Sequence, residues 1–287
     1  MEYVQFGNTG REVSRIGYGG AVIGLKNYLD VFDPKDQTDR TSCIAAIHRA
    51  LELGINYFDT APGYGDGESE TILGEALSGY DFSKLFIATK IGPGFEKGTA
   101  AQSVEASLKR LGAPVLDLIQ LHGNSYDRDS ARSILEPGGR LDELIELKRQ
   151  GLVRHIGFTT EDNNDSVYSF INDGRFEMVQ MCYNLFFQHP YDPNRPFGSL
   201  FETKKAGMAT AVMRSTTSGV FSRWMRMVDP ENTRDYTPDL LRFVFSNPLV
   251  DVVLIGMRSA VQVEQNVAIC NDIDKRIDIM DLFRYYK

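Results

Sequence analysis

The sequence predicts an α/β fold, a (β/α)8 TIM barrel with an N-terminal β-hairpin at its bottom, as a single domain over residues 1–287. Short apolar runs alternate with helix-like stretches along the chain, and eight such pairs suit a barrel of this length. Most of the runs are continuously apolar, as expected of parallel strands buried on both faces. The expected strands are Ile16–Gly20, Ile55–Phe58, Leu85–Thr89, Leu116–Leu121, Arg154–Phe158, Met178–Cys182, Met208–Met213 and Asp251–Ile255.

Helical spacing fills the stretches between these runs. Apolar residues recur at intervals of three and four in Thr41–Leu53, Thr99–Leu111 and Leu141–Lys148, and a glycine follows each stretch closely. Because glycine commonly ends a helix, we expect helices over these segments. Residues 3–14 are expected to form the hairpin, and residues 214–233 a long irregular loop of the kind that often carries function.

The composition is that of an acidic globular chain, with 42% hydrophobic residues and a formal net charge of −8. This charge is unsuited to binding a nucleic-acid backbone. We find no signal peptide and no apolar run of the roughly 20 residues that a membrane span requires. The cysteines Cys43, Cys182 and Cys270 are widely spaced and odd in number, which favours free thiols in a reducing cytosol. We therefore expect a cytoplasmic protein that acts on a small molecule, with no metal and with its oligomeric state left open.

Four polar residues are placed at the ends of strand-like runs: Asp59, Tyr64, Lys90 and His122. Barrel enzymes draw their catalytic groups from the C-terminal ends of several strands. A lysine ammonium is expected to lower the pKa of a nearby tyrosine, and a carboxylate beside the lysine keeps it charged. A histidine can orient a carbonyl oxygen and share the proton. Since no activated nucleophile is evident, the carbonyl carbon is expected to receive a hydride from a cofactor.

These residues carry a family resemblance. Asp59–Gly65 (DTAPGYG) resembles the D-x-A-x-x-Y-G signature of the aldo-keto reductases, and the runs that reach Lys90 and His122 match two further catalytic strands of that family. The resemblance extends over nearly the whole chain, from Phe6–Gly17 to Ile255–Ser259 and Asn266. It implies that Tyr64 is the general acid in carbonyl reduction and the base in alcohol oxidation, that Lys90 and Asp59 tune it, and that His122 orients the substrate.

The resemblance also implies a nicotinamide cofactor at the top of the barrel. NADP(H) is favoured, with NAD(H) as the alternative, and the absence of a G-x-G-x-x-G run agrees with a barrel site. Two positions depart from the family pattern: Thr160 replaces an amide, and Arg214 stands where many members stack an aromatic ring. The expected cofactor contacts are Thr159, Thr160, Gln180, Arg214, Gly219, Arg258, Ser259, Gln262 and Asn266.

The substrate is not readable from the sequence, because loops after the strands set specificity in such barrels. The candidate substrate-lining residues are Tyr28, Asn124, Tyr126 and Trp224. The leading hypothesis is an NADP(H)-dependent reductase of an aldehyde, ketone or sugar carbonyl. Two alternatives stay open: an NAD(P)-dependent sugar or polyol dehydrogenase that uses the same site in the oxidative direction, and a cofactor-binding regulatory subunit that senses redox state.

Overall fold

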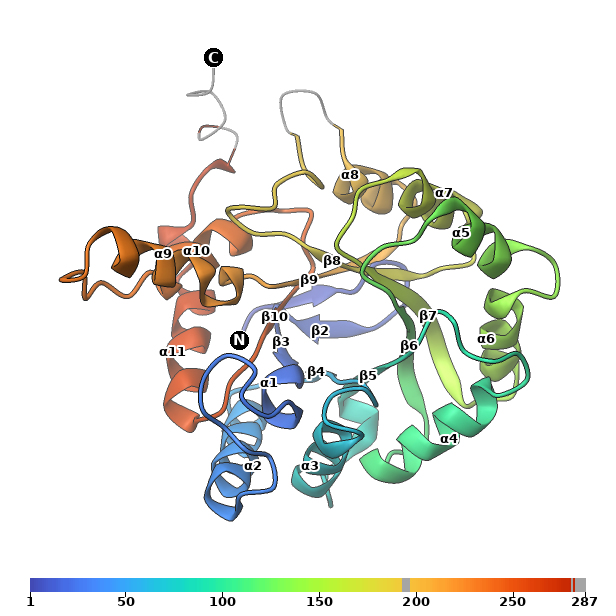
Figure 1. Ribbon diagram of the computed structural model, residues 1–287, viewed down its shortest axis with the longest axis horizontal. Helices are drawn as coiled ribbons and strands as arrows, with labels where there is room; N and C mark the ends of the chain where they lie inside the picture. The colour runs from blue at the N-terminus through green and yellow to red at the C-terminus, as the bar shows by residue number, and fades with distance from the viewer. Residues whose placement is uncertain (193–196, 280, 282–287) are drawn as a thin grey trace.

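The computed structural model describes residues 1–192, 197–279 and 281. Within them eight parallel strands close into a barrel in the order β10-β3-β4-β5-β6-β7-β8-β9 (Figure 1). The predicted (β/α)8 barrel is confirmed, and each predicted strand agrees with the observed one to within two residues at either end. The barrel strands are β3 (Ile16–Gly19), β4 (Tyr57–Asp59), β5 (Phe86–Ile91), β6 (Leu116–His122), β7 (Val153–Thr160), β8 (Met178–Cys182), β9 (Ala209–Met213) and β10 (Val252–Ile255).

Helices surround the barrel and cover the outer faces of its strands (Figure 1). The α-helices are α1 (Ala21–Gly24), α2 (Gln37–Glu52), α3 (Glu68–Ala76), α4 (Ala100–Leu111), α5 (Arg128–Leu135), α6 (Arg140–Arg149), α7 (Asp165–Asp173), α8 (Ser199–Lys205), α9 (Val220–Val228), α10 (Thr237–Phe245) and α11 (Ala260–Asn271). Short 3-10 turns are η1 (Phe82–Lys84), η2 (Thr217–Gly219) and η3 (Ile273–Lys275).

Two of the predictions for these connections are wrong. Helix α2 begins at Gln37, four residues before the predicted start, because the Asp36 carboxylate caps it by accepting from the backbone N–H groups of Thr38 and Asp39. Residues 214–233 are not irregular throughout, since they contain η2 and α9. Gly219, with φ of 73°, forms the N-cap of α9 without a side-chain cap, so the usual polar start signal is missing.

Alternation along the strands decides which side chains enter the barrel. In its lower half the barrel is filled by apolar side chains that include Tyr57, Phe86, Leu118 and Met178. Nearer the C-terminal ends of the same strands, the inward positions are polar. They come two residues after the apolar ones in β4, β6 and β8, and four residues after in β5. They hold Asp59, Lys90, Gln120 and Gln180, all of them buried. The barrel is therefore apolar at its bottom and polar at the C-terminal ends of its strands.

The N-terminal hairpin, β1 (Tyr3–Gln5) with β2 (Glu12–Ser14), closes the bottom of the barrel. Phe6 packs edge-on against Tyr57 and Phe86, with ring centroids 5.4 and 5.1 Å away. Gly7, with φ of +50°, lies so close to the start of β9 that a Cβ atom would come within 2.3 Å of the Ala209 nitrogen. The predicted position of the hairpin is thus confirmed.

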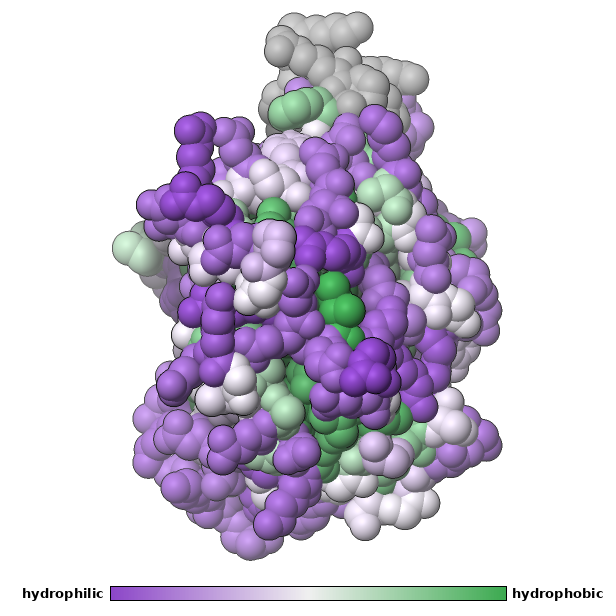
Figure 2. Space-filling view, turned by 90° about the vertical axis from the view of Figure 1, so that its right-hand side faces the viewer, coloured by the Kyte–Doolittle hydropathy of each residue, from purple (hydrophilic) through white to green (hydrophobic). Residues whose placement is uncertain are grey.

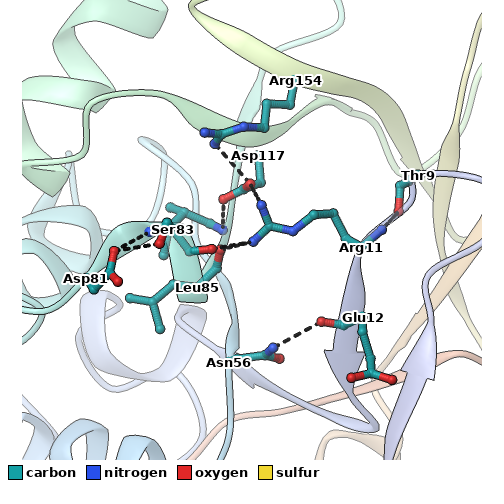
Figure 3. A network of polar contacts seen from close by, with 10 residues as sticks. Thr9, Arg11, Glu12, Asn56, Asp81, Ser83, Leu85, Asp117 and Arg154 are labelled. Atoms are coloured by element: carbon teal, nitrogen blue, oxygen red, sulfur yellow. Dashed lines mark hydrogen bonds and ion pairs between the residues drawn. The ribbon is translucent and has the colours of Figure 1, made fainter.

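A polar network connects the hairpin to the segment just before β5 and to the first residues of β6 (Figure 3). The Arg11 guanidinium donates to the carbonyl oxygens of Ser83 and Leu85, at 3.2 and 2.7 Å, and lies 3.4 Å from the carboxylate of Asp117. Arg154 reaches the same carboxylate at 3.1 Å. The buried Asp117 side chain therefore joins the hairpin, β5, β6 and β7 at one point.

The outer surface over α5 and α6 is mostly hydrophilic, with small apolar areas between the helices (Figure 2). Several large apolar side chains that are exposed lie in other segments, including residues 28–31 and 224–228, and Phe186, Phe187 and Phe197. In the part of the chain that the structure describes, none of the helices has both the length and the apolar character needed to cross a membrane.

Candidate active site

A buried ion pair stands at the polar end of the barrel. The Lys90 ammonium donates to Asp59 Oδ2 at 2.6 Å and to the carbonyl oxygen of Thr60 at 2.8 Å, and the two charged side chains are 0% and 4% exposed. Gln120 donates from Nε2 to the other oxygen of Asp59 at 3.0 Å. A buried charge needs such a partner, since an unpaired one would be costly. The pairing of Lys90 with Asp59 that the sequence suggested is present.

Tyr64 lies in the turn after β4, five residues beyond Asp59, and not at the end of a strand of its own. The turn is held by hydrogen bonds from the Tyr64 N–H to the Ala61 carbonyl and from the Ser69 N–H to the Tyr64 carbonyl. Gly65 has a φ of +71°, and a Cβ there would be 2.0 Å from the Gly24 carbonyl oxygen. Only glycine suits this position, so the residue after Tyr64 allows the turn to fold back toward the barrel.

The four residues come together as the sequence indicated. Lys90 Nζ lies 4.8 Å from the centroid of the Tyr64 ring. The rings of Tyr64 and His122 meet edge to face, with centroids 5.6 Å apart. Asp59 and His122 lie at the ends of β4 and β6, and Lys90 lies one residue before the end of β5. A carboxylate, an ammonium, a phenol and an imidazole thus occupy one end of the barrel.

Burial dominates the pKa values in this cluster. It raises the pKa of Tyr64 by more than the Lys90 ammonium lowers it. The expected net lowering is therefore wrong in sign, although the effect of Lys90 has the expected direction. Burial would lower the pKa of Lys90, but Asp59 and Tyr64 together raise it, so the ammonium stays charged. Burial, and then the Lys90 charge, lower the pKa of His122 to about 4. Tyr64 is protonated and His122 neutral at pH 7.

A cavity of about 250 Å³ opens beside this cluster. It is bordered by Asp59, Tyr64 and His122, and by two of the predicted substrate-contact residues, Tyr28 and Asn124. Gln180 borders it from β8. Among the described residues, the buried Oε1 atom of Gln180 has no hydrogen-bond partner. Because an unpaired buried acceptor is costly, this atom is positioned to receive a donor from a bound molecule.

Arg214 borders the same cavity at the end of β9. Its backbone has a φ of 58°, a conformation that non-glycine residues rarely adopt, and its carbonyl accepts from Asn184 Nδ2 at 2.9 Å. Its guanidinium pairs with Glu161 at 2.6 Å, and Glu161 also borders the cavity. Arg214 thus lies beside the site, as expected of a cofactor contact, and also forms an ion pair there.

A second cavity, of about 580 Å³, continues toward α11. It shares Thr216, Ile255 and Gly256 with the first cavity, so the two cavities are neighbours, and we refer to the pair as the groove. Gln262 and Asn266, both predicted as cofactor contacts, border it. Ser259 is the N-cap of α11, and its hydroxyl accepts from the Gln262 N–H at 3.3 Å. The backbone N–H of Arg258 donates to Gln262 Oε1 at 2.7 Å, which places Arg258 beside the groove.

Several predicted contact residues lie away from the two cavities. Among the described residues that border either cavity, we do not find Thr159, Thr160, Gly219, Tyr126 or Trp224, nor Arg258 and Ser259, which lie next to the groove. The hydroxyl of Thr159 donates to the Gly123 carbonyl at 2.7 Å, and that of Thr160 donates to the carbonyls of Asn124 and Asp162. Both hydroxyls thus serve the backbone of neighbouring loops.

Two of the aromatic candidates for substrate contact, Tyr126 and Trp224, pack against other aromatic rings. Tyr126 is 1% exposed, donates to the Leu121 carbonyl and meets Phe170 edge-on at 4.8 Å. Trp224, on α9, is 58% exposed and packs against Phe186, with ring centroids 5.2 Å apart. Their positions give no support to the predicted substrate contacts, because both face other surroundings.

Two residues of the site were not identified from the sequence. Gln120 stands two positions before His122, so the alternation of a strand could have placed both inside the barrel. Glu161 follows the end of β7 directly and could have been recognised as a loop residue at the catalytic face. Both bring polar groups to the cluster or to the cavity that the cluster borders.

A parallel eight-stranded barrel with this cluster at the carboxyl ends of its strands defines a class, that of barrel enzymes with their chemistry at that face. The chain belongs to the aldo/keto reductase family, whose sequence profile matches residues 15–240. It is accordingly an oxidoreductase, as the resemblance of the DTAPGYG segment implied.

The chain is similar in sequence to relatives that are named by their activities. L-galactose dehydrogenase of Arabidopsis thaliana is 26% identical over 312 residues, which cover 96% of this chain and 89% of the plant protein. The NADH-specific methylglyoxal reductase of Escherichia coli is 30% identical over 207 residues, covering 64% of this chain and 60% of the bacterial one.

Solved structures share the fold. The holo form of aldo-keto reductase AKR11C1 from Bacillus halodurans superposes with a TM-score of 0.75 at 24% identity, covering 98% of this chain and 96% of that one. An aldo/keto reductase from Klebsiella pneumoniae in complex with NADP and acetate gives 0.75 at 21% identity, covering 99% and 95%.

Proposed function

We propose that the chain reduces the carbonyl group of an aldehyde, ketone or sugar to an alcohol, with NADP(H) as cofactor and Tyr64 as proton donor. The observation that carries the proposal is the cluster of Asp59, Lys90, Tyr64 and His122 beside a cavity that continues toward α11. Membership of the aldo/keto reductase family supports the redox character of the reaction.

The groove fits a nicotinamide cofactor, the kind that this family uses. The unpartnered Gln180 Oε1 lies where a carboxamide N–H can donate to it. Gln262 and Asn266 border the far end, where the adenosine would be held, and the N-terminus of α11 and Arg258 suit its phosphate. When bound, the cofactor supplies the hydride that the carbonyl carbon receives.

The chain's own residues handle the oxygen. The Tyr64 hydroxyl and the neutral His122 imidazole donate to the substrate oxygen and hold it in the cavity. As negative charge grows on that oxygen, the Tyr64 proton moves to it. The ammonium of Lys90 stabilises the phenolate that remains, and Asp59 keeps this ammonium in place. Gln120 holds the second carboxylate oxygen, so the pair cannot turn away from Tyr64.

A second candidate runs the same site in the oxidative direction, as a sugar or polyol dehydrogenase. It is favoured by the Arabidopsis thaliana relative, which is named L-galactose dehydrogenase and matches over 96% of this chain. Asn124, Glu161 and Arg214 border the cavity and offer polar groups to the hydroxyls of a sugar. In this direction Tyr64 takes the proton that it gives in reduction.

We also propose a reducing compartment, the cytoplasm, as the place of action. Cys43, Cys182 and Cys270 are free and buried. Burial raises the pKa of each thiol, to about 11 for Cys43 and Cys270 and about 12 for Cys182, which favours the unreactive thiol. Detection of the protein in the soluble cytoplasmic fraction tests this location.

The function is tested by Tyr64→Phe, assayed with aldehydes, ketones and aldoses and with each cofactor. Because the variant lacks only the transferable proton, we expect kcat for reduction to fall by about 10²–10⁴-fold. The Kd of NADPH and NADH, measured by fluorescence, should change little. Tyr80→Phe is the matched control, since Tyr80 is a partly exposed tyrosine packed near His48. Full activity of Tyr64→Phe would remove the proposed acid.

A further inference from the structure

The loop between α1 and α2, residues 25–36, folds over the groove as a built unit. The Asn27 N–H donates to the Phe32 carbonyl at 2.9 Å, and the Phe32 N–H donates back to Asn27 Oδ1 at 3.0 Å. Lys26 and Asp33 close the base of the loop with an ion pair of 2.5 Å. Phe32 is buried and anchors the loop to the core. The tip, residues 28–31, is therefore held in a defined position.

This tip contacts the groove and a residue that lies next to it. Tyr28 and Leu29 border the catalytic cavity. The next residue, Asp30, forms an ion pair with Arg258, although 228 residues separate the two. Phe32 lies under the same guanidinium, 4.4 Å from the ring centroid to Cζ. One loop thus borders the substrate side of the groove and pairs with Arg258, the arginine proposed above to suit the cofactor phosphate.

Arg258 is suited to a phosphate by its place as well as its charge. It follows Gly256, which borders both cavities, and precedes the N-terminus of α11. Helix N-termini and arginine guanidinium groups both favour phosphate oxygens. Its side chain is only 17% exposed, while that of Asp30 is 69% exposed. Most of the Arg258 side chain is therefore covered by the protein, and an exposed carboxylate pairs with its guanidinium.

We propose that Asp30 sets the choice between NADP(H) and NAD(H) by competing with the 2′-phosphate for Arg258. This inference rests on the proposed cofactor groove. A 2′-phosphate that approaches Arg258 meets a guanidinium already neutralised by a carboxylate, and two like charges must share it. NAD(H) has a hydroxyl at this position and meets no such repulsion. Asp30 therefore lowers the affinity for NADP(H) and leaves that for NAD(H) almost unchanged.

The test measures Kd for NADPH and for NADH with the full-length protein and with Asp30→Asn. We expect Asp30→Asn to bind NADPH about tenfold more tightly and NADH within twofold of the original chain, since Asp30 is largely exposed and its charge partly screened. The gain should shrink as salt rises. Asp33→Asn is the matched control, because Asp33 lies on the same loop but pairs with Lys26. It should leave the Kd of NADPH and that of NADH unchanged.

A double-mutant cycle with Arg258→Ala completes the design. Arg258→Ala alone should weaken NADPH much more than NADH, and Asp30→Asn should give no further gain in that background. The proposal is overturned if Asp30→Asn leaves NADPH unchanged, weakens both cofactors, or acts no differently from Asp33→Asn. It is also overturned if the original chain binds neither cofactor, which would end the proposed function as well. Loss of the Tyr64 result alone would affect the reaction and not these binding constants.

Discussion

Two buried carboxylates stand at opposite ends of the barrel, and only one of them belongs to the candidate active site. Asp59 lies at the C-terminal end of β4 and is 3% exposed, while Asp117 lies at the start of β6 and is 1% exposed. Burial is the largest influence on both, and it raises both pKa values. By burial and pKa alone the two residues cannot be told apart.

Their partners separate them. Asp117 accepts from the Ile87 N–H at 2.9 Å and forms ion pairs with Arg11 and Arg154, at 3.4 and 3.1 Å. Asp59 faces Lys90, which lies over the ring of Tyr64, and Tyr64 borders a cavity. The carboxylate at the bottom, Asp117, pairs with two arginines and so holds strands together. The one at the top acts on a group that can release a proton to a ligand.

This difference shows that a perturbed buried acid is weak evidence of catalysis until its contacts are followed outward. Structural ion-pair networks shift pKa values as active sites do. What marks the upper site is a continuous sequence of contacts from Asp59 through Lys90 to Tyr64 and into a cavity. The lower network fixes the hairpin, whose position at the barrel bottom depends on Arg11 (Figure 3).

The largest expected effect is on catalysis at the upper end. Lys90→Met should lower kcat by about 10²–10⁴-fold, because the phenolate of Tyr64 loses the ammonium that stabilises it. Since Lys90 lowers the pKa of Tyr64, its loss should also move the pH profile of alcohol oxidation upward. Lys84→Met, at an exposed lysine of η1, serves as control. An unchanged profile together with a lower kcat would mean that Lys90 does not tune Tyr64.

At the lower end we expect the opposite division between stability and activity. Asp117→Asn should lower the free energy of unfolding by about 3 kcal/mol, because Arg11, Arg154 and the Ile87 N–H lose a charged acceptor. The kcat of the folded fraction should stay within about twofold. Urea unfolding and steady-state kinetics measure the two quantities, and Asp81→Asn, an exposed change beside the network, is the control. A large fall in kcat with normal stability would contradict the comparison.

The fold could be predicted because its signals are local. Continuous apolar runs such as Leu116–Leu121 fix strands buried on both faces, and the DTAPGYG segment fixes the turn that carries Tyr64. The start of α2 was missed because the cap at Asp36 lies before the first apolar residue. Trp224 and Phe221, three residues apart, could have indicated α9, but its Gly219 cap gives no polar signal.

The details of the site depend on contacts between distant segments, and these were harder to predict. The net direction of the Tyr64 pKa depends on how much protein covers it, which the sequence does not state. The hydroxyls of Thr159 and Thr160 bind loop carbonyls that lie 36 residues away. Asp30 meets Arg258 only because the barrel closes β10 against β3. The sequence pattern identified the four clustered residues, whereas the fold decides which of the other candidates border the groove.

The smallest expected effect concerns pH and again separates the two ends. The pKa of His122 is about 4 in the folded chain because of burial and the Lys90 charge, and about 6.5 when exposed. Between these values the unfolded chain binds more protons, so the contribution of His122 to stability is present above pH 6.5 and is lost as pH falls toward 4. His122→Asn should therefore lose less stability than the original chain between pH 7 and 5, by on the order of 1–2 kcal/mol.

Urea unfolding at the two pH values measures this difference, and an identical loss in both proteins would show that His122 is not held neutral by its surroundings. Asp117→Asn should leave this acid-dependent loss in place, because its partners lie at the other end of the barrel.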